Sequence, residues 1–168
     1  MDSHGHGTHV AGTIAAVAGN GIGIVGVAPQ SKIMALKGLG ANGYGATAGL
    51  AQAIIYAADN GADVINNSWG GPGFSTIITD AVNYATQMGV VVVCAAGNSN
   101  EDAFEFMPAS IKNAITVAAW DQDDEKTYFS NYAKIDVAAP GGGKTGEQAD
   151  APEHYNILSL KSAVNGFA

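Results

Sequence analysis

Apolar positions along the chain follow two different periods, which predicts helices and strands in alternation. Small apolar residues recur at helical spacing at positions 10, 14 and 18 and again at 11 and 15, so a first helix is expected to begin near Thr8. Two further helices are expected over residues 47–60 and 76–88, closed by Gly61 and Gly89. Ser75 is placed to cap the second of these at its N-terminus.

Short apolar, β-branched runs separate these helices and predict strands at residues 32–37, 63–66, 90–95, 114–119, 135–139 and 156–160. The run from Val90 to Ala95 is continuously apolar, as expected of a strand buried on both faces of a parallel sheet. Strands that alternate with helices form right-handed βαβ units. The predicted fold class is therefore α/β, a three-layer arrangement with a mostly parallel sheet and helices on both faces.

Composition narrows the classes of partner. The formal net charge of −8 argues against binding to nucleic acid or to an anionic membrane surface, since both need basic patches. No apolar run reaches the roughly 18 residues that span a bilayer, and no signal peptide precedes the first motif. The single cysteine, Cys94, excludes an internal disulfide and is expected to be inert within its apolar strand.

The most informative stretch runs from His4 to Gly12 and holds three histidines separated by glycine and threonine. His6 is expected just before the N-terminus of the first helix, where the partial positive charge favours the neutral imidazole that a general base needs. A metal site is the alternative, but His6 and His9 are three residues apart with no glutamate between them, unlike a helical zinc motif. The spacing disfavours a metal site, and the remaining alternative is histidines of a glycine-rich turn whose partners are solvent.

The string from His6 to Thr13 resembles the histidine motif of the subtilisin-like serine peptidases, the subtilases. The resemblance implies that His6 is the catalytic histidine and that His9 is structural. Asn98, in Ala95-Ala96-Gly97-Asn98, is similar to the family's oxyanion-hole asparagine, whose amide stabilises the tetrahedral intermediate. An asparagine that caps the loop after a strand is the alternative interpretation.

Two segments resemble the walls of the family's substrate cleft. The resemblance implies that a peptide strand lies between them, bound by β-addition and touching Ala95 and Gly97 as well. These segments are Gly43-Tyr44-Gly45 and Ser68-Trp69-Gly70. Trp69 stands where the better-known members have leucine, so the shape of the pocket is expected to differ, although a core tryptophan is the alternative.

The glycine-rich segment after the first helix matches a loop that wraps calcium in subtilases. By position the ligands are Val17, Asn20, Ile22 and Ile24. The family's other ligands come from upstream segments, so a structural turn is the alternative. A dinucleotide site is disfavoured, because a helix precedes the glycines and Pro29 follows them. The chemistry itself requires no cofactor.

The resemblance covers Asp2 to about Leu160 and maps onto the middle of the family's catalytic domain. In subtilisin the triad follows the chain order Asp, His, Ser. No Gly-Thr-Ser motif follows Asn98, since Ser159 and Ser162 lie in Ser-Leu-Lys-Ser-Ala, and Asp2 lies in the turn beside His6. Residues 1–168 are therefore expected to be a partial domain, incomplete at both ends, without the strand of the triad aspartate and the helix of the serine.

Three functions remain open at this stage. The favoured one is a secreted serine endopeptidase acting on peptides or proteins, represented by a chain that is inactive alone; its oligomeric state is open. The alternatives are a non-catalytic pseudopeptidase that binds peptides and a non-peptidase α/β enzyme. In the family the missing aspartate strand separates the strands matched by residues 32–37 and 63–66, so bare strand edges and a tendency to aggregate are expected.

Overall fold

The computed structural model describes residues 2–143 and 157–162, and the chain divides into two compact units. One unit comprises Met1–Ala53 with Leu158–Ala168, and the other comprises Ile54–Ile157. No helix among the described residues is long and apolar enough to cross a membrane.

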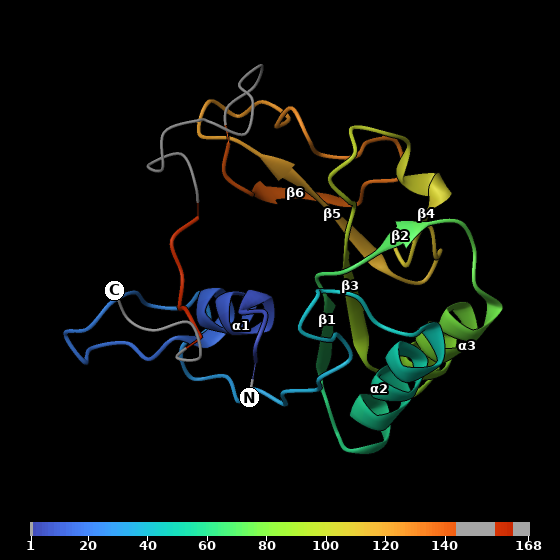
Figure 1. The fold of residues 1–168 in the computed structure, drawn as a ribbon, viewed down its shortest axis with the longest axis horizontal. Helices are drawn as coiled ribbons and strands as arrows, with labels where there is room; N and C mark the ends of the chain where they lie inside the picture. The colour runs from blue at the N-terminus through green and yellow to red at the C-terminus, as the bar shows by residue number, and fades with distance from the viewer. Residues whose placement is uncertain (1, 144–156, 163–168) are drawn as a thin grey trace. The chain divides into compact units, whose positions relative to one another are not determined.

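The second unit is built on a parallel sheet whose strand order is β1-β3-β5-β6 (Figure 1). The strands are β1 (Val64–Asn67), β3 (Val91–Ala95), β5 (Ile115–Trp120) and β6 (Val137–Pro140). A short antiparallel pair joins β2 (Gly71–Pro72) to β4 (Phe106–Met107). The 3-10 helix η1 (Ala103–Glu105) directly precedes β4. The predicted α/β class and its mostly parallel sheet are confirmed.

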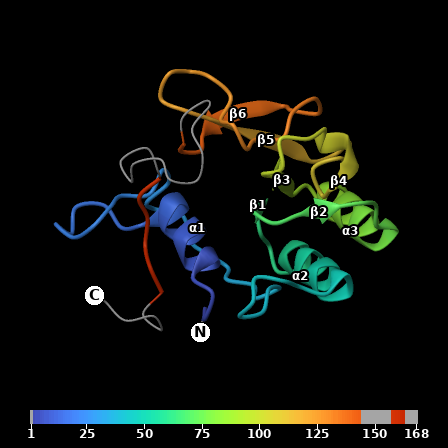
Figure 2. The ribbon, with the colours of Figure 1, turned by 45° about the horizontal axis from the view of Figure 1, so that its top comes forward.

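Helix α3 (Thr76–Gln87) packs against β3 and lies beside the C-terminal half of α2 (Thr47–Asp59) in both views (Figures 1 and 2). The Tyr84 hydroxyl donates to Asp59 Oδ1 at 2.6 Å and links these helices. Both helices have the predicted bounds to within a residue. The Ser75 hydroxyl accepts from the Ile78 amide, and the glycines that follow the two helices adopt positive φ.

The prediction that residues 90–95 are buried on both faces is wrong. Burial alternates along β3: Val92 is 1% exposed, whereas Val91 is 44% exposed. The parallel register places Val64 of β1 beside Val91, and Val64 is also exposed. Successive side chains of a strand point to opposite faces, and the described residues of the second unit bury one face of this sheet.

The first unit contains α1 (His6–Ala15), which begins two residues before the predicted start at Thr8 and ends before residue 18. Beyond the helix the chain folds back, so that the amides of residues 26, 27 and 28 donate to the carbonyls of residues 16, 13 and 14. Gly26 permits this approach, because a Cβ there would stand 2.5 Å from the backbone nitrogens of Ala15 and Ala16. The apolar period therefore placed both ends of the helix two to three residues too late.

The strands predicted at residues 32–37 and 156–160 are wrong for the residues that can be checked. Residues 32–37 and 157–160 carry no strand, and Asn156 lies outside the described residues. Strand residues need a neighbouring strand to pair their peptide groups, and the described residues provide none for these segments. The outer edge of β1 likewise has no partner strand among residues 2–143 and 157–162. The expected tendency to aggregate stays a prediction.

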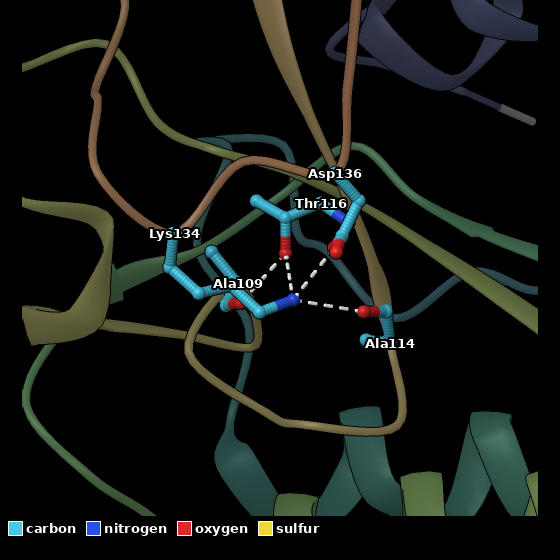
Figure 3. A network of polar contacts seen from close by, with 5 residues as sticks. All are labelled: Ala109, Ala114, Thr116, Lys134 and Asp136. Carbon is cyan, nitrogen blue, oxygen red and sulfur yellow. Dashed lines mark hydrogen bonds and ion pairs between the residues drawn. The ribbon is translucent and has the colours of Figure 1, made fainter.

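A polar clamp joins the start of β5 to the segment that enters β6 (Figure 3). Lys134 Nζ donates to Ala114 O at 2.9 Å, to Thr116 Oγ1 at 2.8 Å and to Asp136 Oδ2 at 2.8 Å. The Thr116 hydroxyl donates onward to Ala109 O at 2.7 Å, and its amide donates to Asp136 Oδ2. The clamp fixes the strand whose neighbour, β3, carries the loop of Asn98.

Candidate active site

The N-terminal turn of α1 is organised by one carboxylate. Asp2 Oδ1 accepts from the amides of Gly5 (2.9 Å) and His4 (3.2 Å), and Oδ2 accepts from the amide (2.8 Å) and hydroxyl (2.9 Å) of Thr8. These bonds, that of Gly5 foremost, hold the pKa of Asp2 far below its usual value. Asp2 lies in the turn where it is predicted, but its capping role is an addition to the prediction, although an acidic residue at a helix start can signal such a role.

His6 is the first residue of α1, not the residue before it as predicted. The cap explains the difference, since Asp2 satisfies the Thr8 amide and Gly5 takes a left-handed conformation with φ of 92°. The His6 side chain is exposed, and its ring lies edge-on to that of His4 with centroids 6.3 Å apart. The imidazole is thus presented at a helix N-terminus on a well-anchored turn.

Residues 159–162 contact the N-terminal turn and helix α1 of the same unit. The Ser159 hydroxyl donates to His9 O at 2.5 Å, and the Ser162 hydroxyl donates to Asp2 O at 2.5 Å. Gly12 allows this contact, because a Cβ there would stand 2.6 Å from the Leu160 side chain. The Ser159 hydroxyl thus donates to the backbone of α1, and the Ser162 hydroxyl donates to the backbone of the turn before it.

The Gly43-Tyr44-Gly45 segment, which the sequence assigned to one rim of a cleft, also lies in the first unit. Gly43 has a φ of 78°, and a Cβ there would stand 2.9 Å from His4 Nε2. The turn is closed by the amide of Gly40, which donates to Tyr44 O at 2.8 Å, while the Tyr44 side chain is 80% exposed. This segment presents backbone and an aromatic side chain to solvent.

The proposed calcium loop offers few suitable oxygens. Asn20 Oδ1 accepts from the Ile22 amide at 3.0 Å in a local turn, and Val17, Asn20 and Ile22 are exposed. With Ile24 these residues supply four neutral oxygens, whereas calcium takes about 6–8 oxygen ligands, usually with carboxylates among them. The described residues also contain no cluster of three metal-ligating side chains. The loop alone does not fit a calcium ion.

Asn98 follows β3 in the second unit, in a loop that begins at Ala96. The Ala96 amide still donates to Val117 O of β5 at 2.9 Å, and the chain then turns at Gly97, whose φ is 113°. The Asn98 side chain is exposed and makes no hydrogen bond with residues 2–143 or 157–162. An unengaged amide at the end of a parallel strand is available to a ligand.

The segment Ser68-Trp69-Gly70 follows β1, the strand next to β3. It therefore lies with the Asn98 loop at the carboxyl edge of one sheet, as predicted. The side-chain amide of Asn66 donates through Nδ2 to Ser68 Oγ at 2.8 Å. Trp69 is partly buried, and a Cβ on Gly70 would stand 2.7 Å from Met107 O. The structure therefore groups this segment with Ala95, Gly97 and Asn98, while His6 and Gly43 to Gly45 belong to the other unit.

Cys94 lies on the buried face of β3, behind the Asn98 loop. It is 1% exposed, and its sulfur receives a long contact of 3.7 Å from the Asn67 amide. Burial raises the pKa of the thiol to about 11. A thiol that stays protonated and inaccessible is a poor nucleophile, in agreement with the expectation from the sequence.

Comparison with known proteins gives a consistent result. The model of the subtilase family matches residues 1–164. A thermophilic serine proteinase of Bacillus sp. (strain AK1) is 51% identical over 142 residues, which is 84% of this chain and 35% of the relative. Thermitase of Thermoactinomyces vulgaris is 48% identical over 84% of this chain and 50% of its own length. The chain thus spans between a third and a half of these relatives.

Solved structures agree. A protease from Pseudoalteromonas arctica matches with a TM-score of 0.79 at 43% identity, over 83% of this chain and 44% of the other. A cold-adapted subtilisin-like serine proteinase matches with a TM-score of 0.75 at 38% identity, over 84% of this chain and 50% of the other.

Proposed function

The chain belongs to the subtilase family, and from that premise we propose that it forms the central part of the catalytic domain of an extracytoplasmic serine endopeptidase. The observation that carries the proposal is the exposed amide of Asn98 at the carboxyl end of β3, which makes no hydrogen bond with the described residues. The substrate class is peptides and proteins, held along Gly43-Tyr44-Gly45 and Ser68-Trp69-Gly70.

His6 is assigned as the general base and Asn98 as the oxyanion donor. In the acyl-enzyme reaction a serine hydroxyl attacks the peptide carbonyl, and His6 takes the proton of that hydroxyl and then passes it to the leaving amine. The oxygen that gains negative charge accepts a hydrogen bond from the Asn98 amide. The serine and the aspartate that orients His6 come from sequence outside these residues, so the 168-residue chain alone does not hydrolyse peptides by this route.

The first test replaces Asn98 with alanine in the protein that carries the aspartate and serine segments. We expect kcat to fall by ~10²–10³ with KM nearly unchanged, which is the size of the loss for the equivalent change in subtilisin. Ser99→Ala, a change to the exposed neighbour of Asn98, is the control. Equal kcat values for wild type and the Asn98 variant would remove the assigned role.

A second test uses the 168-residue chain and a serine-reactive fluorophosphonate, with the labelled peptide mapped by mass spectrometry. No adduct is expected on this chain, and one serine should be labelled in the longer protein. A stoichiometric adduct on Ser159 or Ser162 would mean that this chain is itself a hydrolase. No adduct on the longer protein would favour the peptide-binding pseudopeptidase.

A further inference from the structure

Asn131 is buried completely, at 0% exposure, yet it carries a polar side chain to which no role has so far been assigned. Its Oδ1 accepts from the amides of Ser99 at 2.9 Å and Glu101 at 3.1 Å. Its Nδ2 donates to Ala96 O at 3.0 Å. All three bonds reach residues more than 29 positions away, in the segment of residues 96–101 that contains Asn98, here named the oxyanion loop.

The backbone of Asn131 adds a fourth bond, because its amide donates to Gly97 O at 3.0 Å. The four bonds therefore bracket Asn98: two go to the peptide groups before it and two to those after it. Asn98 itself makes no hydrogen bond with the described residues. A loop held on both sides of one free side chain keeps that side chain in a fixed place without engaging its amide.

Gly97 and Asn131 depend on each other. A Cβ on Gly97 would stand 2.4 Å from Asn131 Nδ2, and the φ of 113° at this glycine is one that other residues rarely adopt. The amide reaches Ala96 O only because no side chain stands in its way. An asparagine suits the position because the loop presents two amide donors and one carbonyl acceptor to it, and a primary amide satisfies both kinds of group.

We propose that Asn131 is a positioning residue for the oxyanion donor: it holds the backbone on either side of Asn98 and so sets where the Asn98 amide points. The inference rests on the proposed function, because the position of the loop matters for catalysis only if Asn98 is the oxyanion donor. A donor must be fixed in advance to stabilise a developing charge, and a displacement of about 1 Å can cost ~10²-fold in rate.

The test is a double-mutant cycle between Asn98→Ala and Asn131→Ala in the protein that carries the complete triad. Asn131→Ala alone is expected to lower kcat by about 10- to 100-fold with KM within about twofold. In the Asn98→Ala background the same change is expected to lower kcat by less than about twofold, because the donor it positions is already gone. Asn131→Asp, which keeps the acceptor for Ser99 and Glu101, is expected to fall between wild type and Asn131→Ala.

Ser130→Ala is the matched control. Ser130 is equally buried and also makes hydrogen bonds, but it bonds the Ala119 amide and the Asn131 carbonyl instead of the oxyanion loop. It is expected to lower stability and leave kcat unchanged. Amide hydrogen exchange in the 168-residue chain gives a second readout: Asn131→Asp should keep the protection of the Ser99 and Glu101 amides that Asn131→Ala loses.

Three results would overturn the inference. Equal fold losses from Asn131→Ala in both backgrounds, or a loss in kcat for Ser130→Ala as large as for Asn131→Ala, would show that the residue acts only on the fold. Ser99 and Glu101 amides that exchange equally in wild type and Asn131→Ala would show that it does not hold the loop. If Asn98→Ala leaves kcat unchanged, the proposed function fails, and the inference fails with it.

Discussion

Replacing Lys134 with methionine tests whether the polar clamp of Figure 3 stabilises the second unit. Methionine keeps most of the apolar stem and removes the amino group, which donates to Ala114 O, Thr116 Oγ1 and Asp136 Oδ2. The Lys134 side chain is 12% exposed, so water replaces these bonds poorly, whereas the Asp136 side chain is 47% exposed. The three bonds are therefore expected to contribute unequally.

The two bonds to the buried partners dominate the estimate. A hydrogen bond from a charged donor contributes about 1.5 kcal/mol at the low end, and an ion pair with a half-exposed carboxylate adds about 0.5 kcal/mol. The expected loss in the free energy of unfolding for Lys134→Met is thus about 3.5 kcal/mol. Asp136→Asn should cost about 0.5–1 kcal/mol, because the amide oxygen still accepts from the Thr116 amide.

Urea unfolding, followed by tryptophan fluorescence, measures both losses. Low protein concentration is used, because the outer edge of β1, which has no partner strand among the described residues, is expected to favour association. The bond from Lys134, and next the Thr116 amide, lower the pKa of Asp136 below its ordinary 3.8. The stabilisation by this carboxylate is thus complete above that value and is lost as pH falls through the folded pKa. A loss for Lys134→Met no larger than that for Asp136→Asn would refute the argument.

Three further predictions follow from the site. Asp2→Ala should destabilise α1 by about 1 kcal/mol, seen as a loss of helical circular dichroism, whereas Asp2→Asn keeps one acceptor oxygen, for Gly5 or for Thr8, and should lose less; equal losses would contradict the capping role. Cys94 should react with a thiol reagent at pH 8 only after urea unfolding, and rapid labelling of the folded chain would contradict its burial. Added calcium should leave the unfolding midpoint of this chain unchanged, and calorimetric binding at micromolar calcium would restore Asn20 as a ligand.

Local sequence signals predicted the second unit well. Helix ends are signalled by single residues. The Ser75 hydroxyl caps a helix start, and the glycines at 61 and 89 end helices because they lack a side chain and adopt positive φ. The alternation of helices and apolar runs gave the parallel sheet. It also placed Asn98 and Ser68 at one edge, because the carboxyl ends of neighbouring parallel strands lie together.

Where prediction failed, the deciding contact lay outside the local window. The start of α1 depends on a carboxylate six residues before Thr8, and the apolar period of the helix contains no information about it. The segment at 32–37 has the composition of a strand, but a strand forms only with a partner, and its own sequence cannot supply one. The apolar run in β3 predicts burial on both faces, but burial also depends on what covers the sheet, which the run itself does not specify.

Asn131 shows the same limit at the site itself. The histidine motif and Asn98 were identified because each belongs to a short, recognisable string, whereas Asn131 acts on Ala96 across 35 positions. Nothing in its neighbours signals that its amide will face Ser99 and Glu101. A polar side chain that is completely buried is hydrogen-bonded to other groups of the protein. A buried amide beside a loop therefore indicates that its side chain holds the loop in place. The backbone path of the oxyanion loop therefore depends on the side chain of Asn131 as well as on the loop's own sequence.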